Sequence, residues 1–372
     1  MMPRNTLKTI AVITASALAL TMPAAAQDTV PDDLTTIAPV PTDFEPPRTS
    51  WGAPDFRGMF PIDNIASIPM QRPERFGARF YLNDEEYQQR LEQASGSDER
   101  YEAEDEAGTI GFGHWVESDA SGRRTSLLVY PEDGQLPDMT EWAQEMYQAG
   151  RSSWTPNTHF DWVDDFDTWD RCVTRGFPAS MFPFRYNNGI RVMQAPGYVI
   201  ISLEMIHDAR VIPIVDGPEA ADAMRWPDEV RTWMGQSIGW WEGNQLVIET
   251  TNIEDGASVS EDNYERGPSP LNMATMGVPP FNTIPTSDQA HVLERLTMTG
   301  PDHIVYELTY TDPEVFTDKW TARLDWTRDE EYEFFEYACH EGNVQIRNYI
   351  TAAAAGVENT EGGAAEGEGG GH

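Results

Sequence analysis

The chain has 372 residues, with 62 Asp or Glu against 25 Lys or Arg, and its formal net charge is −37. So strong an acidic excess repels nucleic-acid phosphates and anionic lipid headgroups, which excludes nucleic acid and membrane surfaces as partners. We interpret the excess as a solubility feature rather than as an acidic binding site.

The N-terminus has the pattern of a secretory signal peptide. Arg4 and Lys8 precede an apolar run over residues 9–22. An Ala-Ala-Ala sequence then fits cleavage before Gln27. No later stretch approaches the roughly 18 to 20 apolar residues that cross a bilayer. We therefore expect a signal peptide over residues 1–26, and a mature protein that is soluble, not inserted in a membrane, and periplasmic or extracellular.

Low-complexity segments flank the body of the chain. Residues 27–50 are acidic, rich in Pro and without period, which predicts an extended, disordered linker. The Gly- and Glu-rich tail over residues 356–372 is also expected to be disordered. The body between them is long enough for one large domain, or for a domain with a substantial N-terminal addition.

The first half of the body, residues 51–170, is predicted to be irregular and helical. Asn83 has the residue type of an N-cap, and the acidic residues that follow it suit the first turn of a helix over residues 83–93. Thr140 is a similar cap for a second helix over residues 140–150.

The second half, residues 171–355, changes to the alternating β-branched and aromatic pattern of strands. The runs are residues 190–195, 197–206, 209–215, 237–241, 244–253, 291–299, 303–311, 318–326 and 331–339. Gly243-Asn244 and Gly300-Pro301-Asp302 mark tight hairpins between them. We therefore predict a mainly β fold: a lipocalin-like antiparallel barrel of about nine strands, whose closure removes exposed sheet edges.

Three blocks of the chain resemble known proteins. They are residues 170–214, 231–253 and 336–343. In the same order, they are similar to blocks in a large group of uncharacterised secreted proteins of Proteobacteria and Acidobacteria, and the resemblance extends over residues 51–355. It implies a lipocalin-like β-barrel and a periplasmic address, and it brings no activity. The matched polar positions are Cys172, Arg175, Asn187, Asn188, His207, Asp208, Arg210, Trp233, Trp241, Glu242, Cys339, His340 and Glu341.

The two cysteines, Cys172 and Cys339, have two possible uses. In an oxidising compartment a pair of this kind favours one disulfide, and the alternative is a thiol nucleophile. If the last strand continues through His340, then Cys339 and His340 point to opposite faces. That geometry is poor for a Cys/His nucleophilic pair, so we predict the disulfide.

The sequence "HDAR" gathers an imidazole, a carboxylate and a guanidinium at a predicted hairpin. Strand alternation places His207 on the apolar face, with Asp208 opposite, so the plain alternative for His207 is a core histidine. In the functional interpretation His207 and Asp208 perform acid/base chemistry, while Arg210 holds an anionic or carbonyl group.

His340 and Glu341 are the matching candidates at the end of the last predicted strand. We predict that they join His207, Asp208 and Arg210 in one polar site at a barrel mouth, where loops collect functional groups. His207, His340 and Glu341 could also form a metal site, but the chain lacks HExxH and CxxC spacings, so we expect no metal.

The sequence leaves two classes of function open. Because the chain has no phosphate loop, GxSxG elbow or dinucleotide fingerprint, we expect no cofactor. The first class is a secreted lyase, isomerase or hydrolase acting on a small cyclic or carbohydrate-like substrate in an aromatic-lined pocket, with Arg175, Trp233 and Trp241 as further substrate contacts. The second is a non-catalytic periplasmic protein that binds an apolar small molecule.

Overall fold

A computed structural model of the chain describes residues 30–108, 122–149, 153, 160–256, 269–271 and 283–354. The signal peptide expected over residues 1–26 and the tail expected over residues 356–372 lie outside these ranges. Among the described residues, no helix is both long enough and apolar enough to cross a membrane.

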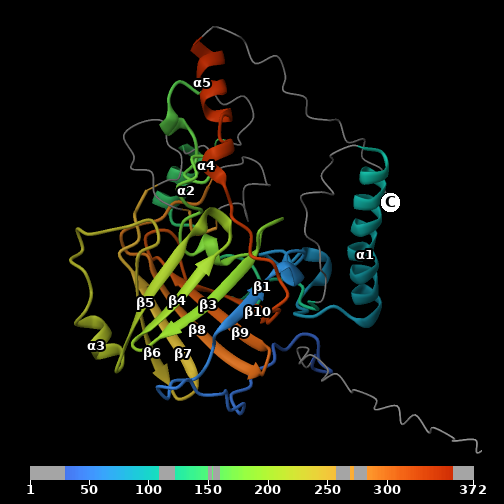
Figure 1. The fold of residues 1–372 in the computed structure, drawn as a ribbon, viewed down its shortest axis with the longest axis vertical. Coiled ribbons are helices and arrows are strands. Elements are labelled where there is room, and N and C mark those ends of the chain that lie inside the picture. Colours follow the sequence, from blue (N-terminus) through green and yellow to red (C-terminus); the bar gives the residue numbers. More distant parts are fainter. Residues whose placement is uncertain are drawn as a thin grey trace, which may run out of the picture.

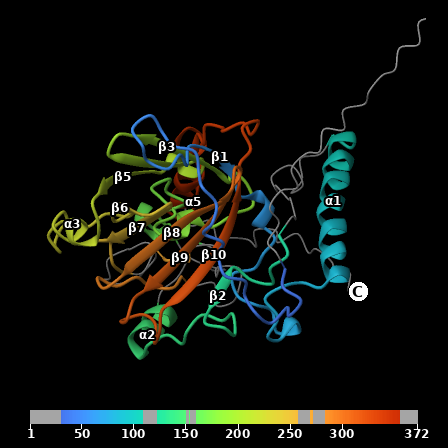
Figure 2. The same cartoon turned by 90° about the horizontal axis from the view of Figure 1, so that it is seen from below.

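The described residues form one ten-stranded sheet that curls into a half-barrel, so the fold is mainly β as predicted (Figure 1). Its strands are β1 (Gly58–Pro61), β2 (Leu128–Tyr130), β3 (Gly189–Ala195), β4 (Tyr198–Leu203), β5 (Ala209–Val215), β6 (Gln236–Glu242), β7 (Gln245–Thr251), β8 (His291–Gly300), β9 (His303–Thr311) and β10 (Trp320–Thr327). Their order in the sheet is β1-β3-β4-β5-β6-β7-β8-β9-β10-β2. Figure 2 shows the curl, with β1 and β3 on the opposite side from β9 and β10.

One strand pair departs from the expected antiparallel pattern. β5 and β6 run parallel, with Ile214 opposite Gly239 and Val215 opposite Trp240. A parallel pair needs a crossover connection, and residues 216–235, which include helix α3 (Pro218–Asp222), provide one. The remaining neighbours in the sheet are antiparallel.

Eight of the nine runs predicted as strands lie in the sheet, and the run over residues 331–339 does not. This segment crosses one end of the sheet without pairing, because the Tyr332 hydroxyl and the Phe335 amide donate to the side chain of Glu204 instead of to a neighbouring strand. It ends in helix α4 (Cys339–Gly342), which is followed by α5 (Gln345–Ala354).

The half of the body that was predicted to be irregular contributes both edges of the sheet, β1 and β2. Its two predicted helices are confirmed as α1 (Asp84–Glu106) and α2 (Glu141–Ala149). Asn83 caps α1 reciprocally, since its side chain accepts from the Glu86 amide and its own amide donates to the Glu86 carboxylate. The Thr140 hydroxyl accepts from the Ala143 amide and caps α2.

The described part of the expected linker, residues 30–50, lies against the body of the protein. The Phe80 amide donates to the carbonyl of Leu34, at 2.8 Å. The Arg323 guanidinium on β10 donates to the carbonyl of Ala38, at 2.7 Å. These hydrogen bonds attach this part of the segment to the loop at Phe80 and to the sheet at β10, where an extended, disordered linker was expected.

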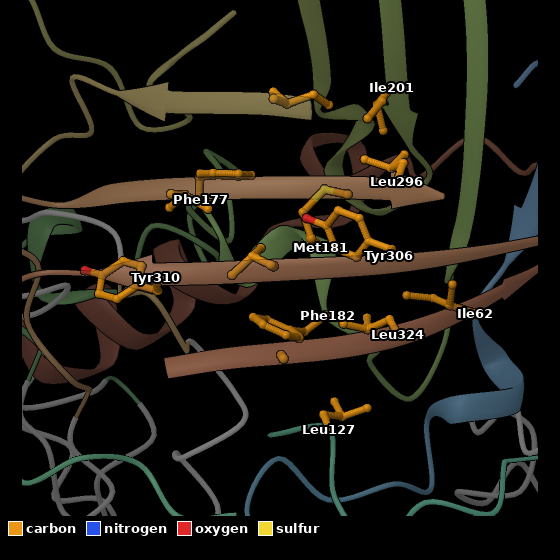
Figure 3. Close-up of a cluster of buried hydrophobic side chains, with 14 of the residues drawn as sticks. Ile62, Leu127, Phe177, Met181, Phe182, Ile201, Leu296, Tyr306, Tyr310 and Leu324 are labelled. Carbon is orange, nitrogen blue, oxygen red and sulfur yellow. The ribbon is translucent and has the colours of Figure 1, made fainter. Parts of the chain in front are cut away.

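Side chains fill the interior of the half-barrel. Phe177, Met181 and Phe182 belong to a segment that enters it, and each is at most 4% exposed. Figure 3 shows them among sheet residues such as Tyr306 and Leu324. The described interior is therefore a packed core, and a site open to small molecules has to be sought at the ends of the strands.

Candidate functional site

The strand directions define two ends of the half-barrel. β4 ends at Leu203, and β5 and β6 begin at Ala209 and Gln236, so these termini lie at the same end. Helices α4 and α5 stand at this end (Figure 1). The predicted disulfide between Cys172 and Cys339 is confirmed there, with a Cα–Cα distance of 5.8 Å. We call this end the disulfide rim, and the opposite end, with the β6–β7 and β8–β9 hairpins, the hairpin rim.

Five polar residues form a cluster at the disulfide rim, which we call the Arg175 cluster: Thr174, Arg175, Tyr186, Asp208 and Tyr337. Four separate segments supply them: the loop after Cys172, the approach to β3, the β4–β5 turn, and the segment before Cys339, which carries Tyr337. The disulfide holds that last segment beside the first.

Asp208 has the electrostatics of a proton-exchanging group. Its Oδ2 accepts a hydrogen bond from the Thr174 hydroxyl, at 2.7 Å, and its side chain is half-buried. Burial raises the pKa of the Asp208 carboxyl to about 6, although the Thr174 hydrogen bond and the charge of Arg175 act in the opposite direction. A carboxyl with such a pKa is ionised at neutral pH and still basic enough to take up a proton.

Arg175 is a buried cation with few partners. Its side chain is 4% exposed, and its Nη1 donates to the carbonyl of Phe182 at 3.1 Å. Its Nε has no hydrogen-bond partner among the described residues. Burial lowers the pKa of Arg175 to about 10, opposed mainly by the negative charge of Asp208. The guanidinium stays protonated at neutral pH and retains unused donor capacity.

Tyr186 and Tyr337 add a hydrogen-bonded pair of phenols to the cluster. Both are half-buried, and burial is the main reason why the pKa of each hydroxyl is raised. The ring of Phe184 packs against Tyr186, with centroids 5.0 Å apart, and lies 5.4 Å from the Arg175 guanidinium carbon. The phenols remain protonated at neutral pH and can donate hydrogen bonds.

Glu204 fixes the surroundings of the cluster. Its buried carboxylate accepts from the Asn187 side chain, the Gly189 amide, the Tyr332 hydroxyl and the Phe335 amide, at 2.6 to 3.1 Å. It thereby ties the approach to β3 to the segment that carries Tyr337. The sequence signal for this role is an acidic residue at the end of an apolar strand, which must find several donors if it is buried.

The backbone is also unusual at this rim. The non-glycine residues with positive φ in the described ranges are Cys172, Asn187, Ile206, His207 and Asn252, and all lie at the disulfide rim. A positive φ is especially unfavourable for a β-branched residue such as Ile206. Backbone outliers of this kind cluster at functional sites, where the surrounding structure holds them in place.

The structure corrects the prediction for His207. β4 ends at Leu203, and residues 205–207 form a short 3-10 turn in which His207 is exposed with φ +61°. Strand alternation therefore does not extend to His207, which is neither on an apolar face nor in the core. Its neighbour Asp208 is the residue that faces the cluster.

Arg210 lies in the interior rather than in the cluster. It is 3% exposed, and its guanidinium donates to both carboxylate oxygens of Glu294, at 2.7 and 2.5 Å. Ser237, Thr250 and the Tyr306 hydroxyl complete a network around this pair. Its charge is compensated within the core, so Arg210 is not available to hold a substrate.

His340 and Glu341 are exposed on α4, next to the disulfide. They share the disulfide rim with His207 and Asp208, but the structure shows no hydrogen bond or ion pair between the two sets in its described residues. Across those same residues, no group of three His, Cys, Asp or Glu side chains could hold a metal ion.

The two tryptophans proposed as substrate contacts lie at different ends of the half-barrel. Trp233 is half-buried at the disulfide rim, beside Met234, whose sulfur lies 3.5 Å from the Thr174 hydroxyl. Trp241 is near the hairpin rim and packs on Phe56, with ring centroids 5.3 Å apart. Only Trp233 is near the cluster.

A shallow cleft of about 360 Å³ opens at the hairpin rim, between β1 and the β8–β9 hairpin. Its charged groups compensate one another: Arg57 pairs with Asp55 at 2.6 Å, and Arg328 pairs with Asp302 and Glu330 at 3.6 and 3.4 Å. None of the residues proposed from the sequence lines it. The Arg175 cluster is therefore the stronger candidate site.

Replacing Asp208 with Asn is expected to stabilise the protein at pH 8 and to change little at pH 4. The pKa of Asp208 is about 6 in the folded protein and about 3.9 in the unfolded chain, so the folded state binds the proton more tightly. The free energy of unfolding of the wild type therefore falls as the pH rises from about 4 to above 6, by an amount on the order of 2 kcal/mol. The Asn variant has no carboxyl to titrate and avoids this loss. Urea unfolding of both proteins at both pH values measures the difference.

A matched control is Asp55→Asn. The Arg57 hydrogen bond lowers the pKa of Asp55, so this variant should lose stability relative to wild type at pH 8, opposite in sign to Asp208→Asn. An Asp208→Asn protein that is less stable than wild type at pH 8 would contradict the assigned electrostatics.

No protein-family model, curated protein or solved structure matches this chain. The geometry and chemistry of the Arg175 cluster are therefore the basis for assigning a function.

Proposed function

We propose that the protein is a secreted, cofactor-independent acid–base enzyme, of lyase, isomerase or hydrolase type, that acts on a small cyclic or carbohydrate-like substrate at the Arg175 cluster. The observation that carries the proposal is the half-buried Asp208 carboxyl, with its pKa raised to about 6, beside a buried guanidinium with an unused donor. Titratable groups perturbed by burial and by a specific charge are typical of catalytic sites.

Asp208 is the general base in this proposal. Ionised at neutral pH, it removes a proton from the substrate. Its raised pKa makes it a stronger base than an ordinary carboxylate. Arg175 stabilises the negative charge that develops on a substrate oxygen, and the buried setting strengthens this interaction. Tyr186, whose hydroxyl accepts from Tyr337 and keeps its own O–H, is the hydrogen-bond donor that completes the set.

This assignment retains Asp208 and Arg175 from the residues identified in the sequence. The phenols of Tyr186 and Tyr337 take the place that was given to His207, His340 and Glu341, because those three are exposed and the phenols face Arg175. Carriage of an apolar ligand has less support, since the described interior is filled by core side chains.

We also propose that the fold is lipocalin-like and that the protein is secreted. The consecutive neighbours from β6 to β10 form an up-and-down meander of the kind found in lipocalin barrels. The signal-peptide pattern and the disulfide support export to the periplasm or the outside of the cell. We also propose that the protein belongs to the group of secreted proteins of Proteobacteria and Acidobacteria, on the basis of the matching sequence blocks.

The test is turnover of a panel of pyranosides, lactones and cyclic ketones, followed by NMR in deuterated water so that proton abstraction is seen directly. Asp208→Asn is expected to lower the rate of any converted substrate about 10² to 10⁴-fold, the usual effect of removing a general base. His207→Ala is the matched control, one residue away and exposed, and should leave the rate within a few-fold. If the His207 variant loses activity and the Asp208 variant retains it, the chemistry belongs elsewhere.

A further inference from the structure

The buried positive charge of Arg175 is only partly compensated by the groups around it. A buried charge is normally paired and fully hydrogen-bonded, because removal from water is costly for an ion. Arg210, in the same half-barrel, is paired with the bidentate Glu294 carboxylate. Arg175 has no such carboxylate: its one hydrogen bond goes to the neutral carbonyl of Phe182, and its Nε, like that of Arg210, is buried without a partner among the described residues.

The nearest anion does not pair with Arg175 directly. Asp208 interacts with the guanidinium through its charge, but its carboxylate is hydrogen-bonded to Thr174. The other titratable groups that face Arg175 are the phenols of Tyr186 and Tyr337, which are neutral at pH 7. The cation therefore has a nearby counter-charge but lacks a carboxylate aligned with its nitrogens, the arrangement that Arg favours most.

We propose that the Arg175 cluster binds a small carboxylate, and that each carboxylate bound brings one proton onto Asp208. The ligand's two oxygens pair with the guanidinium, and the proton comes from solvent. The cluster then holds one cation and one anion, as it did before, because Asp208 has become neutral. Without the proton, two carboxylates would compete for a single buried cation, which is unfavourable.

The inference rests on the proposed function and concerns regulation of the same site: while a carboxylate is bound, Asp208 is neutral and cannot take up a substrate proton, so the acid acts as an inhibitor. The residues of the site also favour an acid that carries a ring. Phe184 lies beneath the guanidinium, and Trp169 packs on Phe184 with centroids 5.3 Å apart. Aromatic faces of this kind pack well against a flat or cyclic body attached to the carboxylate. Benzoate, with acetate for comparison, is the probe.

The experiment is calorimetric titration of benzoate into the full chain at pH 5, 6, 7 and 8, in buffers that differ in ionisation enthalpy. The association constant is expected to fall toward tenfold per pH unit above pH 6, with uptake approaching one proton per benzoate, as linkage requires. Asp208→Asn should bind benzoate with no such pH dependence over this range. Acetate should bind more weakly than benzoate, and benzyl alcohol, which has the ring without the charge, should not compete.

Arg175→Met removes the guanidinium and keeps much of the apolar volume, and it should abolish binding. A poorly paired buried cation can be replaced by an apolar residue without loss of the fold, which a thermal melt verifies. Arg57→Met, at the exposed hairpin rim, is the control and should bind as wild type does. Equal binding by wild type and Arg175→Met, pH-independent binding by wild type, or effective competition by benzyl alcohol would each overturn the inference.

The two proposals fail separately. If benzoate binds with proton uptake while Asp208→Asn leaves turnover of the substrate panel unchanged, the carboxylate site stands and the catalytic assignment is lost. If turnover requires Asp208 and no carboxylate binds, the enzyme assignment stands and the site has no carboxylate inhibitor.

Discussion

Replacing both Cys172 and Cys339 with serine is expected to lower the free energy of unfolding by about 5 kcal/mol, the chain-entropy value for a loop of this size. The bond joins residues 167 positions apart, so it restricts most of the unfolded chain. It also attaches the segment that carries Tyr337 to the loop that carries Thr174 and Arg175. The variant should therefore lose the Arg175 cluster before it loses the sheet.

Guanidinium denaturation of the oxidised wild type, the reduced wild type and the double serine variant measures this effect. The last two should agree, since both lack the cross-link and differ only in sulfur against oxygen. Benzoate titration of the folded double variant reports separately on the cluster. A stability loss below about 1 kcal/mol would show that the reduced chain remains restricted in some other way.

Glu294→Gln is expected to destabilise the protein by about 3 to 5 kcal/mol, because it leaves the Arg210 charge buried and uncompensated. Both side chains of the pair are at most 1% exposed, and the Arg210 Nη2 to Glu294 Oε2 distance is 2.5 Å. Replacing both residues with apolar ones, as in Arg210→Met with Glu294→Leu, should recover much of the loss. Urea unfolding of Arg210→Met, Glu294→Leu and the double variant gives the coupling energy.

The control is the exposed pair of Arg295 and Glu242, whose side chains are 36% and 47% exposed. Glu242→Gln should change stability by less than about 1 kcal/mol, as surface ion pairs do. If Glu294→Gln proves as mild as Glu242→Gln, then water reaches Arg210 and the interior is not the packed core that the structure indicates.

The features that the sequence predicted correctly are encoded by residues close together in the chain or by the number of cysteines. Asn83 and Thr140 cap helices through hydrogen bonds to residues three positions away, and Gly243 adopts the positive φ that its hairpin requires. The disulfide needed no spatial information, because two cysteines in an oxidising setting have only one way to pair. Eight strands followed from alternation that continues through short turns.

The incorrect predictions arose where a local pattern lacked its tertiary partner. Residues 331–339 alternate like a strand, but they pair with no strand of the sheet, and Glu204 accepts hydrogen bonds from the Tyr332 hydroxyl and the Phe335 amide. Alternation through residues 204–207 failed for a similar reason: the chain turns after Leu203 to bring Asp208 back toward β5. A periodic pattern specifies which side chains alternate, and it does not specify whether a neighbouring strand is present.

By itself, the sequence determined the mainly β class, the two helix caps, the hairpins and the single disulfide, since each is encoded by neighbouring residues or by the number of cysteines. Only the tertiary structure decided what the polar residues do. Arg175 and Arg210 look alike in the sequence, yet the fold gives Arg210 a buried bidentate carboxylate partner and leaves Arg175 beside Asp208 without one. Burial and the choice of partner set the chemistry of a charged group, and both come from segments distant in the chain.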